Sequence, residues 1–398
     1  MKNKLDNLEL KNSLLDFLTW FESNGFDTYD NNDIWASKIG NKVKSIYIKK
    51  PKIGLIPLAI IHLMDVFIPS VRILLSNKKA FSCAKAEMMM GYINLEKIFS
   101  NNDYRKNVIT ISRDLINISN KTNNGIGWGV PYKWVTPDGD LPLNSPSIVQ
   151  TSHCFHAFDK IFLETKDEKY LEIIQKITNF VYEDLKININ NSKSEPSKYG
   201  YNFPVLTFNT IAIRASILMR AYKLFEDEKY KNASMKNINY LADYQNDDGS
   251  WFYSHDLDSI DNFHTCYILK SLYSAYRSCN DNLIIDIANK GYDYYKNNFI
   301  RPDGTLIHCT KNTNPKFRYI ELLDYAEAIK LEIEIKKATN KNLLFASDLV
   351  NQVVHKFQTK KGYFITRINS LGMKNKIPYL RWPQAPLFNA LTEYYIYS

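Results

Sequence analysis

The strongest constraint on the fold is a helical segment that recurs along the chain. KDEKYLEII at 166–174 returns as EDEKYKNAS at 226–234, so that Tyr170 and Tyr230 occupy the same place in the two copies. Weaker copies of the segment lie at 101–116, 280–295 and 340–357. Each copy is a short polar turn that opens a helix, and the unit of roughly 55 to 65 residues is longer than most helical repeats. Such a chain builds its core by packing neighbouring copies together.

A second helical pattern precedes each of these segments. Its apolar residues recur three and four apart, as in Phe155, Phe158 and Phe162, which is typical of a helix and not of a strand. We expect these apolar helices at 81–99, 152–164, 209–225, 262–277, 321–338 and 384–397. The unit is therefore a helix, a tight turn, a second helix and a longer loop. Five such units follow one another, and a last apolar helix at 384–397 closes the chain. Six apolar helices predict an all-α fold, an (α/α)6 toroid of six helical hairpins in which residues 1–80 supply the sixth outer element or a lid.

The chain of 398 residues, with 45% apolar residues, can build one large core. We expect residues 81–398 to form the toroid. Residues 1–80 are expected to be a helical segment that packs on the toroid or completes it, so that the chain is one structural domain.

The charge distribution bears on the partners. The net charge of +9 is spread along the chain, whereas nucleic-acid binders usually concentrate their basic residues. The densest basic segment, 41–52, adjoins an apolar run at 53–75 that contains two prolines and three ionisable residues. This interruption favours an amphipathic helix over a membrane span. We expect no nucleic-acid partner and a peripheral membrane contact through 41–78.

The five cysteines are scattered, without CxxC spacing, and several lie among apolar residues. We expect buried free thiols in a reducing compartment. The N-terminal segment mixes charged and apolar residues and shows no apolar stretch before a small-residue cleavage site, so we expect no signal peptide. The expected location is the cytoplasm, at the inner membrane surface if the apolar segment contacts lipid.

The long loops join each outer helix to the next inner helix, so they should share one face of the ring. That face also receives the positive N-termini of the inner helices, and residues from separate units should meet there. The candidate catalytic residues are Asp261, His264 and Asp324. Asp261 either caps the helix through the amide of His264 or takes part in catalysis. His264 is either a neutral base or a structural histidine. Asp324 is either an acid or part of a solvated first turn.

Aromatic residues on the long loops can stack on sugar faces, although some must seal helix ends. Trp251, after an Asp-Gly turn, favours the structural role. Arg381 either clamps a uronate or phosphate or forms a salt bridge where the ring closes. The candidate substrate-binding residues are Trp128, Tyr132, Trp134, His153, Asn209, Trp251, Tyr253, Glu321, Tyr379, Arg381, Trp382 and Gln384.

The sequence offers little for a metal or cofactor. His153 and His156 have helical spacing, but no third ligand is evident, and there is no HExxH or CxxC motif. No Walker loop, dinucleotide fingerprint or Ser-nucleophile elbow is present either. We expect no metal and no cofactor.

Six stretches resemble, in order, those of a bacterial protein family tied to surface-polysaccharide biosynthesis, the VpsJ-like group. They are GFDTYDNNDIWAS, WGVPYKW, FNTIAIRA, QNDDGSWFY, IDNFHTCYILKSL and KIPYLRWPQAPLFNAL. The resemblance runs from about residue 25 to the C-terminus. It implies a fold similar to six-hairpin glycosidases, the helical domain of glucuronyl C5-epimerases and the terpene-cyclase and prenyltransferase toroids.

The resulting hypothesis is a carbohydrate-active protein of surface-polysaccharide assembly. Its expected partner is an oligo- or polysaccharide, either free or linked to a lipid. If it is an enzyme, acid-base chemistry of epimerase, lyase or hydrolase type is expected. A non-catalytic glycan-binding or scaffold protein is the alternative from a different class. Polyprenyl or terpenoid processing is a third, disfavoured because the chain lacks a DxDD motif and an Asp-rich diphosphate site.

Overall fold

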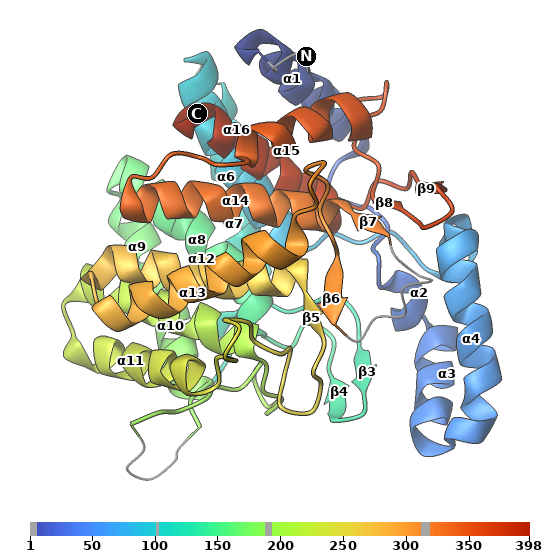
Figure 1. Cartoon of the computed structure of the whole chain (residues 1–398), viewed down its shortest axis with the longest axis horizontal. Helices are drawn as coiled ribbons and strands as arrows, with labels where there is room; N and C mark the ends of the chain where they lie inside the picture. The colour runs from blue at the N-terminus through green and yellow to red at the C-terminus, as the bar shows by residue number, and fades with distance from the viewer. Residues whose placement is uncertain (1–5, 101–102, 188–192, 312–318) are drawn as a thin grey trace.

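In the computed structural model, which describes residues 6–100, 103–187, 193–311 and 319–398, the chain forms a closed ring of paired helices (Figure 1). The inner helices are α6 (Ser82–Phe99), α8 (Ile148–Thr165), α10 (Phe208–Phe225), α12 (Asn262–Cys279), α14 (Leu322–Thr339) and α16 (Ala385–Tyr397). Each inner helix contacts the next one, and α16 contacts α6. The predicted (α/α)6 toroid is therefore confirmed.

An outer helix packs against each inner helix. The outer helices are α7 (Tyr104–Asn117), α9 (Glu168–Asn179), α11 (Glu228–Asp243), α13 (Asn282–Phe299), α15 (Ala346–Gln352) and α1 (Asn7–Asn24). π-Helical turns extend α9 and α15 and precede α16; they are η2 (Phe180–Asp184), η4 (Val353–Phe357) and η5 (Leu380–Gln384). The N-terminal helix α1 packs on the C-terminal helix α16, so the two ends of the chain share one hairpin.

The sequence repeat is visible in the backbone of the tight turns. After five inner helices, a non-glycine residue adopts a left-handed conformation with φ between 49° and 57° and ends the helix. These residues are Ser100, Lys166, Glu226, Asn280 and Asn340. Aspartate side chains then cap three of the outer helices that follow, through Asp167, Asp227 and Asp281.

Short strands decorate the long loops. They are β1 (Asn120–Lys121), β2 (Ile126–Gly127), β3 (Trp134–Thr136), β4 (Gly139–Leu141), β5 (Ile260–Asp261), β6 (Cys309–Lys311), β7 (Ile320–Glu321), β8 (Arg367–Ile368) and β9 (Lys374–Asn375). These strands pair in antiparallel fashion: β1 with β2, β3 with β4, β5 with β6, and β8 with both β7 and β9. Strands β3 to β9 gather at the end of the ring where the inner helices begin, which we call the loop face (Figure 1).

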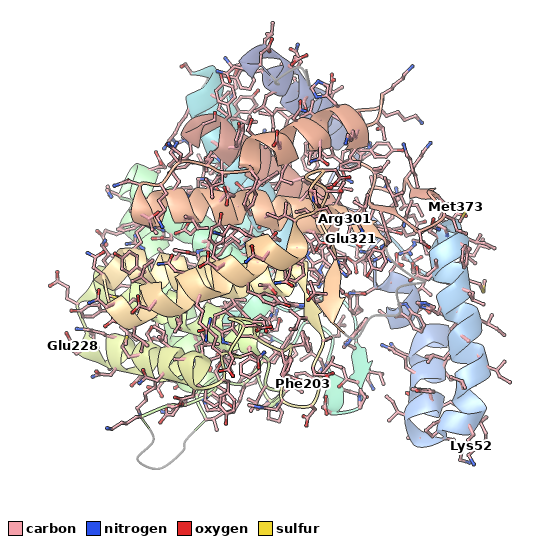
Figure 2. All side chains as sticks on the ribbon, in the orientation of Figure 1. Lys52, Phe203, Glu228, Arg301, Glu321 and Met373 are labelled. Atoms are coloured by element: carbon pink, nitrogen blue, oxygen red, sulfur yellow. The ribbon has the colours of Figure 1, made fainter. Side chains whose placement is uncertain are left out.

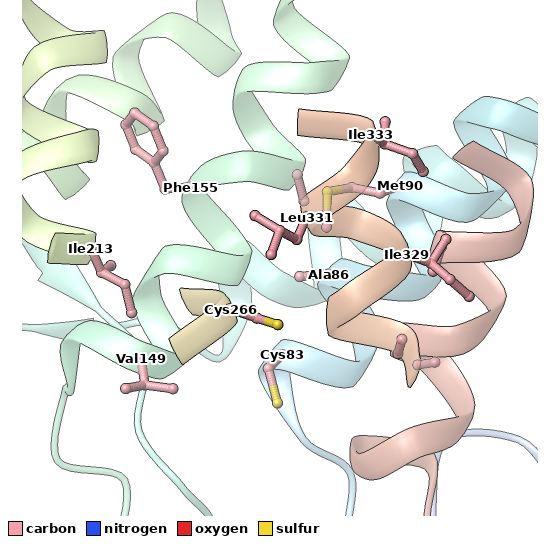
Figure 3. Packing of buried hydrophobic residues seen from close by; sticks show 14 of the residues in the cluster. Cys83, Ala86, Met90, Val149, Phe155, Ile213, Cys266, Ile329, Leu331 and Ile333 are labelled. Carbon is pink, nitrogen blue, oxygen red and sulfur yellow. The ribbon is translucent and has the colours of Figure 1, made fainter. Parts of the chain in front are cut away.

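The core lies between the two layers of helices and within the ring. Figure 3 shows side chains from several inner helices meeting in one cluster, among them Met90, Phe155, Ile213, Cys266 and Leu331. The five cysteines are free, and three of them are buried. Burial raises the pKa of the Cys83 thiol to about 11, which keeps it protonated.

Residues between α1 and α6 form an arm beside the ring (Figure 1). It contains α2 (Asp33–Ala36), α3 (Lys38–Lys49), α4 (Pro51–Phe67), the 3₁₀ turn η1 (Pro69–Val71) and α5 (Arg72–Leu75). In the part of the chain that the structure describes, no single helix has the length and apolar character of a membrane span. One bent pair, Pro51–Phe67 with Pro69–Leu75, meets these two requirements jointly, with a 108° angle between its halves.

Candidate functional site on the loop face

Asp261 both caps a helix and holds a histidine. It is the N-cap of α12, where its Oδ1 accepts a hydrogen bond of 2.9 Å from the backbone N–H of His264. Its Oδ2 lies 2.6 Å from Nδ1 of His264. One carboxylate therefore fixes the helix start and the orientation of the imidazole, and the two roles considered for it from the sequence are compatible.

Asp324 is also paired with a histidine, one that the sequence analysis did not single out. Nδ1 of His308, in the loop before β6, lies 2.8 Å from Oδ2 of Asp324 in the first turn of α14. Asp324 is 1% exposed, and its Oδ1 is buried without a hydrogen-bond partner among the described residues.

The pairing of β5 with β6 brings these two pairs together. Asp261 is opposite Cys309 in the ladder, and the N–H of Asn262 donates to the carbonyl of His308. The ring of Phe263 lies close to both imidazoles, with its centroid 4.1 Å from that of His264 and 5.9 Å from that of His308. Two neighbouring inner helices thus present two histidine-carboxylate pairs on one face.

The surroundings of the two carboxyl groups shift their pKa values in opposite directions. Burial alone would raise the pKa of Asp261, but the charge and hydrogen bonds of His264 outweigh it, and the pKa is lowered. At Asp324 burial prevails over the attraction of His308 and raises the pKa to about 7. Burial would lower the pKa of His308, yet the attraction of Asp324 holds it well above its usual value. The buried pair therefore retains a proton to a higher pH than a free imidazole does.

Partly exposed aromatic rings surround the imidazoles. Tyr253 lies 4.8 Å from His264, and Tyr319 lies 4.6 Å from His308, as centroid distances. Trp382 lies 6.4 Å from Phe263 on the same face. Together, Tyr253, Phe263, Tyr319 and Trp382 form what we call the aromatic rim. Flat apolar faces with polar edges suit a sugar ring.

Asn209 joins the His264 side of this site. It lines a small pocket together with Trp251, Tyr253, Asp261 and His264. Its Oδ1 is buried without a hydrogen-bond partner among the described residues. Because an unpaired buried oxygen is costly, Asn209 is suited to accept a hydrogen bond from a ligand.

Several other predicted substrate-binding residues serve the packing instead. Trp128 and Trp251 are buried, and their indole N–H groups donate to Leu115 and Leu241, near the ends of α7 and α11. The predicted sealing role of Trp251 is thus present in the structure. Tyr379 is buried under Arg72, whose guanidinium lies 4.6 Å from its ring. Rings with no exposed face cannot stack on a sugar in this conformation.

Arg381 and three further residues of the predicted set are engaged with other protein groups. Arg381 is buried, donates 2.7 Å to Tyr132 and 3.2 Å to Asp30, and so forms the salt bridge at the closing seam that the sequence analysis considered. Its guanidinium stacks on Trp382 at 3.8 Å. The other three contact different groups: Glu321 pairs with Arg367, Gln384 bonds to the backbone of Phe364, and the ring of Trp134 lies under the ammonium of Lys44.

His153 belongs to a different region. It lies 2.8 Å from Glu87, and both line a cavity of about 850 Å³ formed by all six inner helices, mainly by their C-terminal halves. Cavity size alone would favour this end as the functional site. Its charged residues, however, are largely paired with each other, as in Lys160 with Glu393 and Arg220 with Asp159.

These charged walls bear on the third hypothesis. Polyprenyl cyclisation requires an apolar cavity, whereas nine Lys and Arg side chains and five Asp and Glu side chains line this one. Among the described residues, no group of three His, Cys, Asp or Glu side chains is placed to hold a metal ion. The free buried oxygens and the aromatic rim make the loop face the better candidate.

No protein-family model and no curated protein matches the sequence. Solved structures do resemble it. Cellobiose 2-epimerase from Bacillus thermoamylovorans B4167 is 13% identical and has a TM-score of 0.61, with 80% of this chain and 88% of that chain covered. D-mannose isomerase is 10% identical and has a TM-score of 0.61, with 98% of this chain and 98% of that chain covered. An unsaturated glucuronyl hydrolase specific for heparin is 9% identical and has a TM-score of 0.63, with 97% of this chain and 96% of that chain covered.

At these identities the similarity shows the fold alone. That fold is the (α/α)6 toroid, and the three neighbours are an epimerase, an isomerase and a hydrolase of sugars.

Proposed function

We propose that this protein is a carbohydrate-active enzyme that moves a proton at a sugar carbon, in a reaction of epimerase or isomerase type. The observation that carries the proposal is the pair of imidazoles on the loop face, each held through Nδ1 by a carboxylate. In the neutral tautomer in which Nδ1–H donates to Asp261, the Nε2 atom of His264 can accept a proton.

The surroundings assign different roles to the two histidines. The side chain of His264 is 24% exposed, and its partner Asp261 is ionised, which suits a general base. The His308–Asp324 pair is more buried and retains its proton, which suits a general acid. A proton transfer needs one group that accepts a proton and another that donates one.

The carboxylates favour proton transfer over hydrolysis. Hydrolysis of a glycosidic bond by the usual mechanism needs one carboxylic acid and one carboxylate facing the bond. Asp261, Asp324 and Glu321 instead engage His264, His308 and Arg367. They orient other groups in this structure.

The substrate class follows from the aromatic rim and from Asn209, which together offer stacking faces and a hydrogen-bond acceptor. The sugar-modifying neighbours support a saccharide. The resemblance of the sequence motifs to a surface-polysaccharide group supports a uronic-acid-containing or lipid-linked glycan of that assembly as the substrate.

The test uses solvent deuterium. The protein is incubated in D₂O with hexoses, hexuronates and their disaccharides, and deuterium at carbon is followed by NMR. We expect exchange by the wild type, and a loss of at least about 100-fold in His264→Gln and His308→Gln. His355→Gln, whose side chain is 43% exposed and lies elsewhere, is the matched control.

The variant Asp261→Asn distinguishes the helix-capping role of Asp261 from its proposed role in proton transfer. Asparagine caps helices as well as aspartate does, so the thermal midpoint should stay near that of the wild type while exchange is lost. Exchange at the wild-type rate in both histidine variants would refute the proposal. Release of reducing ends without deuterium at carbon would show a hydrolase.

A further inference from the structure

The arm beside the ring exposes many large apolar side chains. Of the 17 residues of α4, all described, only Gly54 and Ile61 are buried. The side chain of Ile56 is 68% exposed, and that of Leu74 in α5 is 84% exposed. The other exposed large apolar residues of α4 and its C-terminal continuation are Ile53, Leu55, Ile60, Leu63, Phe67, Ile68 and Ile73. An apolar surface of this extent marks an interaction site.

The charges around this surface have one sign. Residues 34–64 contain six lysines and no aspartate or glutamate. Lys49, Lys50 and Lys52 are exposed at the turn between α3 and α4, and Figure 2 shows Lys52 at the end of the hairpin away from the ring. A partner for this arm must accept apolar side chains and also offer negative charge.

The hairpin is a preformed element. A Cβ at Gly54 would lie 2.3 Å from Cα of Tyr47, so glycine lets α4 cross α3 closely. At its base, the buried guanidinium of Arg72 pairs with Asp33 in α2, at 2.9 Å, and with Asp65 in α4. This ion cluster fixes the bend after α4, so α4 and α5 do not continue as one straight helix.

We propose that the α3–α4 hairpin docks on the surface of an anionic phospholipid membrane, with α4 lying in the interface plane. The exposed isoleucine and leucine side chains enter the boundary of the acyl chains, and the lysines pair with lipid phosphates. Because α3 contacts β3, the docked protein holds its loop face beside the membrane.

Vesicle flotation tests this docking. The full chain is mixed with vesicles of equal parts phosphatidylglycerol and phosphatidylcholine, or of phosphatidylcholine alone. We expect binding to the anionic vesicles that weakens with salt. Lys50→Glu/Lys52→Glu should lower the partition coefficient by at least about fivefold per lysine. Ile56→Asp/Ile60→Asp should lower it by at least about tenfold for each isoleucine.

The control is Leu344→Asp, which replaces an equally exposed leucine (65%) in the loop between α14 and α15. Since Ile56, Ile60 and Leu344 are all exposed, thermal melting should confirm that each variant folds. The proposal is wrong if the wild type does not float with anionic vesicles, or if Ile56→Asp/Ile60→Asp floats as well as Leu344→Asp. A wild-type dimer that Ile56→Asp/Ile60→Asp dissociates, without vesicle binding, would assign the surface to a second copy instead.

Discussion

Replacing Phe17 by alanine tests whether the N-terminal helix completes the ring. Phe17 is fully buried in α1, and its ring lies 5.0 Å from Phe388 on α16 and 5.8 Å from Phe364, as stacked pairs. Truncating a buried phenylalanine removes its transfer free energy and leaves a cavity, at a cost of about 3–5 kcal/mol. Since native stabilities are only about 5–15 kcal/mol, such a loss is large.

The assay is urea unfolding followed by far-UV circular dichroism. Leu15→Ala is the matched control, because Leu15 belongs to the same helix and is 40% exposed. We expect it to change the free energy of unfolding by no more than about 0.5 kcal/mol. If Phe17→Ala lowers that free energy by less than about 1 kcal/mol, α1 is not packed as the sixth outer helix.

Three further predictions concern buried groups. The free energy of unfolding should fall as pH rises above about 6.5, because folded His308 keeps a proton that the unfolded imidazole loses. Asp324→Asn should flatten this slope. Equal slopes for the wild type and the variant, in urea titrations at several pH values, would contradict the prediction. Lys330→Met removes a cation 2.8 Å from buried Glu87 and should cost about 3–5 kcal/mol, with partial recovery in Glu87→Gln/Lys330→Met. A urea midpoint that stays unchanged in Lys330→Met would be inconsistent with a stabilising ion pair between Lys330 and Glu87. Gly91→Val should cost about 1–3 kcal/mol and lower the thermal midpoint, since a Cβ at Gly91 in α6 would lie 2.3 Å from the ring of Phe388 on α16. A thermal midpoint equal to that of the wild type would show that α6 and α16 pack less closely than this distance implies.

The sequence determined the helical hairpins because their signals are local. Apolar residues three and four apart define the inner helices, and aspartates such as Asp167 and Asp227 cap the outer ones within the same few residues. The repetition of that unit then predicted the closed ring, since each apolar stripe must be covered by its neighbours.

The site could be predicted only in part. Asp261 and His264 are three residues apart at a helix start, so their pairing follows from local geometry. The partner of Asp324 could not be predicted in this way, because His308 reaches Asp324 through the register of β5 and β6 and through the packing of α14. The one signal was that His308 follows an Asp-Gly turn, in a loop equivalent to the one before His264.

Tertiary structure alone decided which aromatic residues face outward. Trp251 and Trp382 both lie in long loops rich in aromatic residues, yet the first is buried and the second is partly exposed. It also decided that α1 pairs with α16, although these helices are at opposite ends of the chain. Local periodicity specifies which side of a helix is apolar, but the partner that covers it depends on the closure of the whole ring.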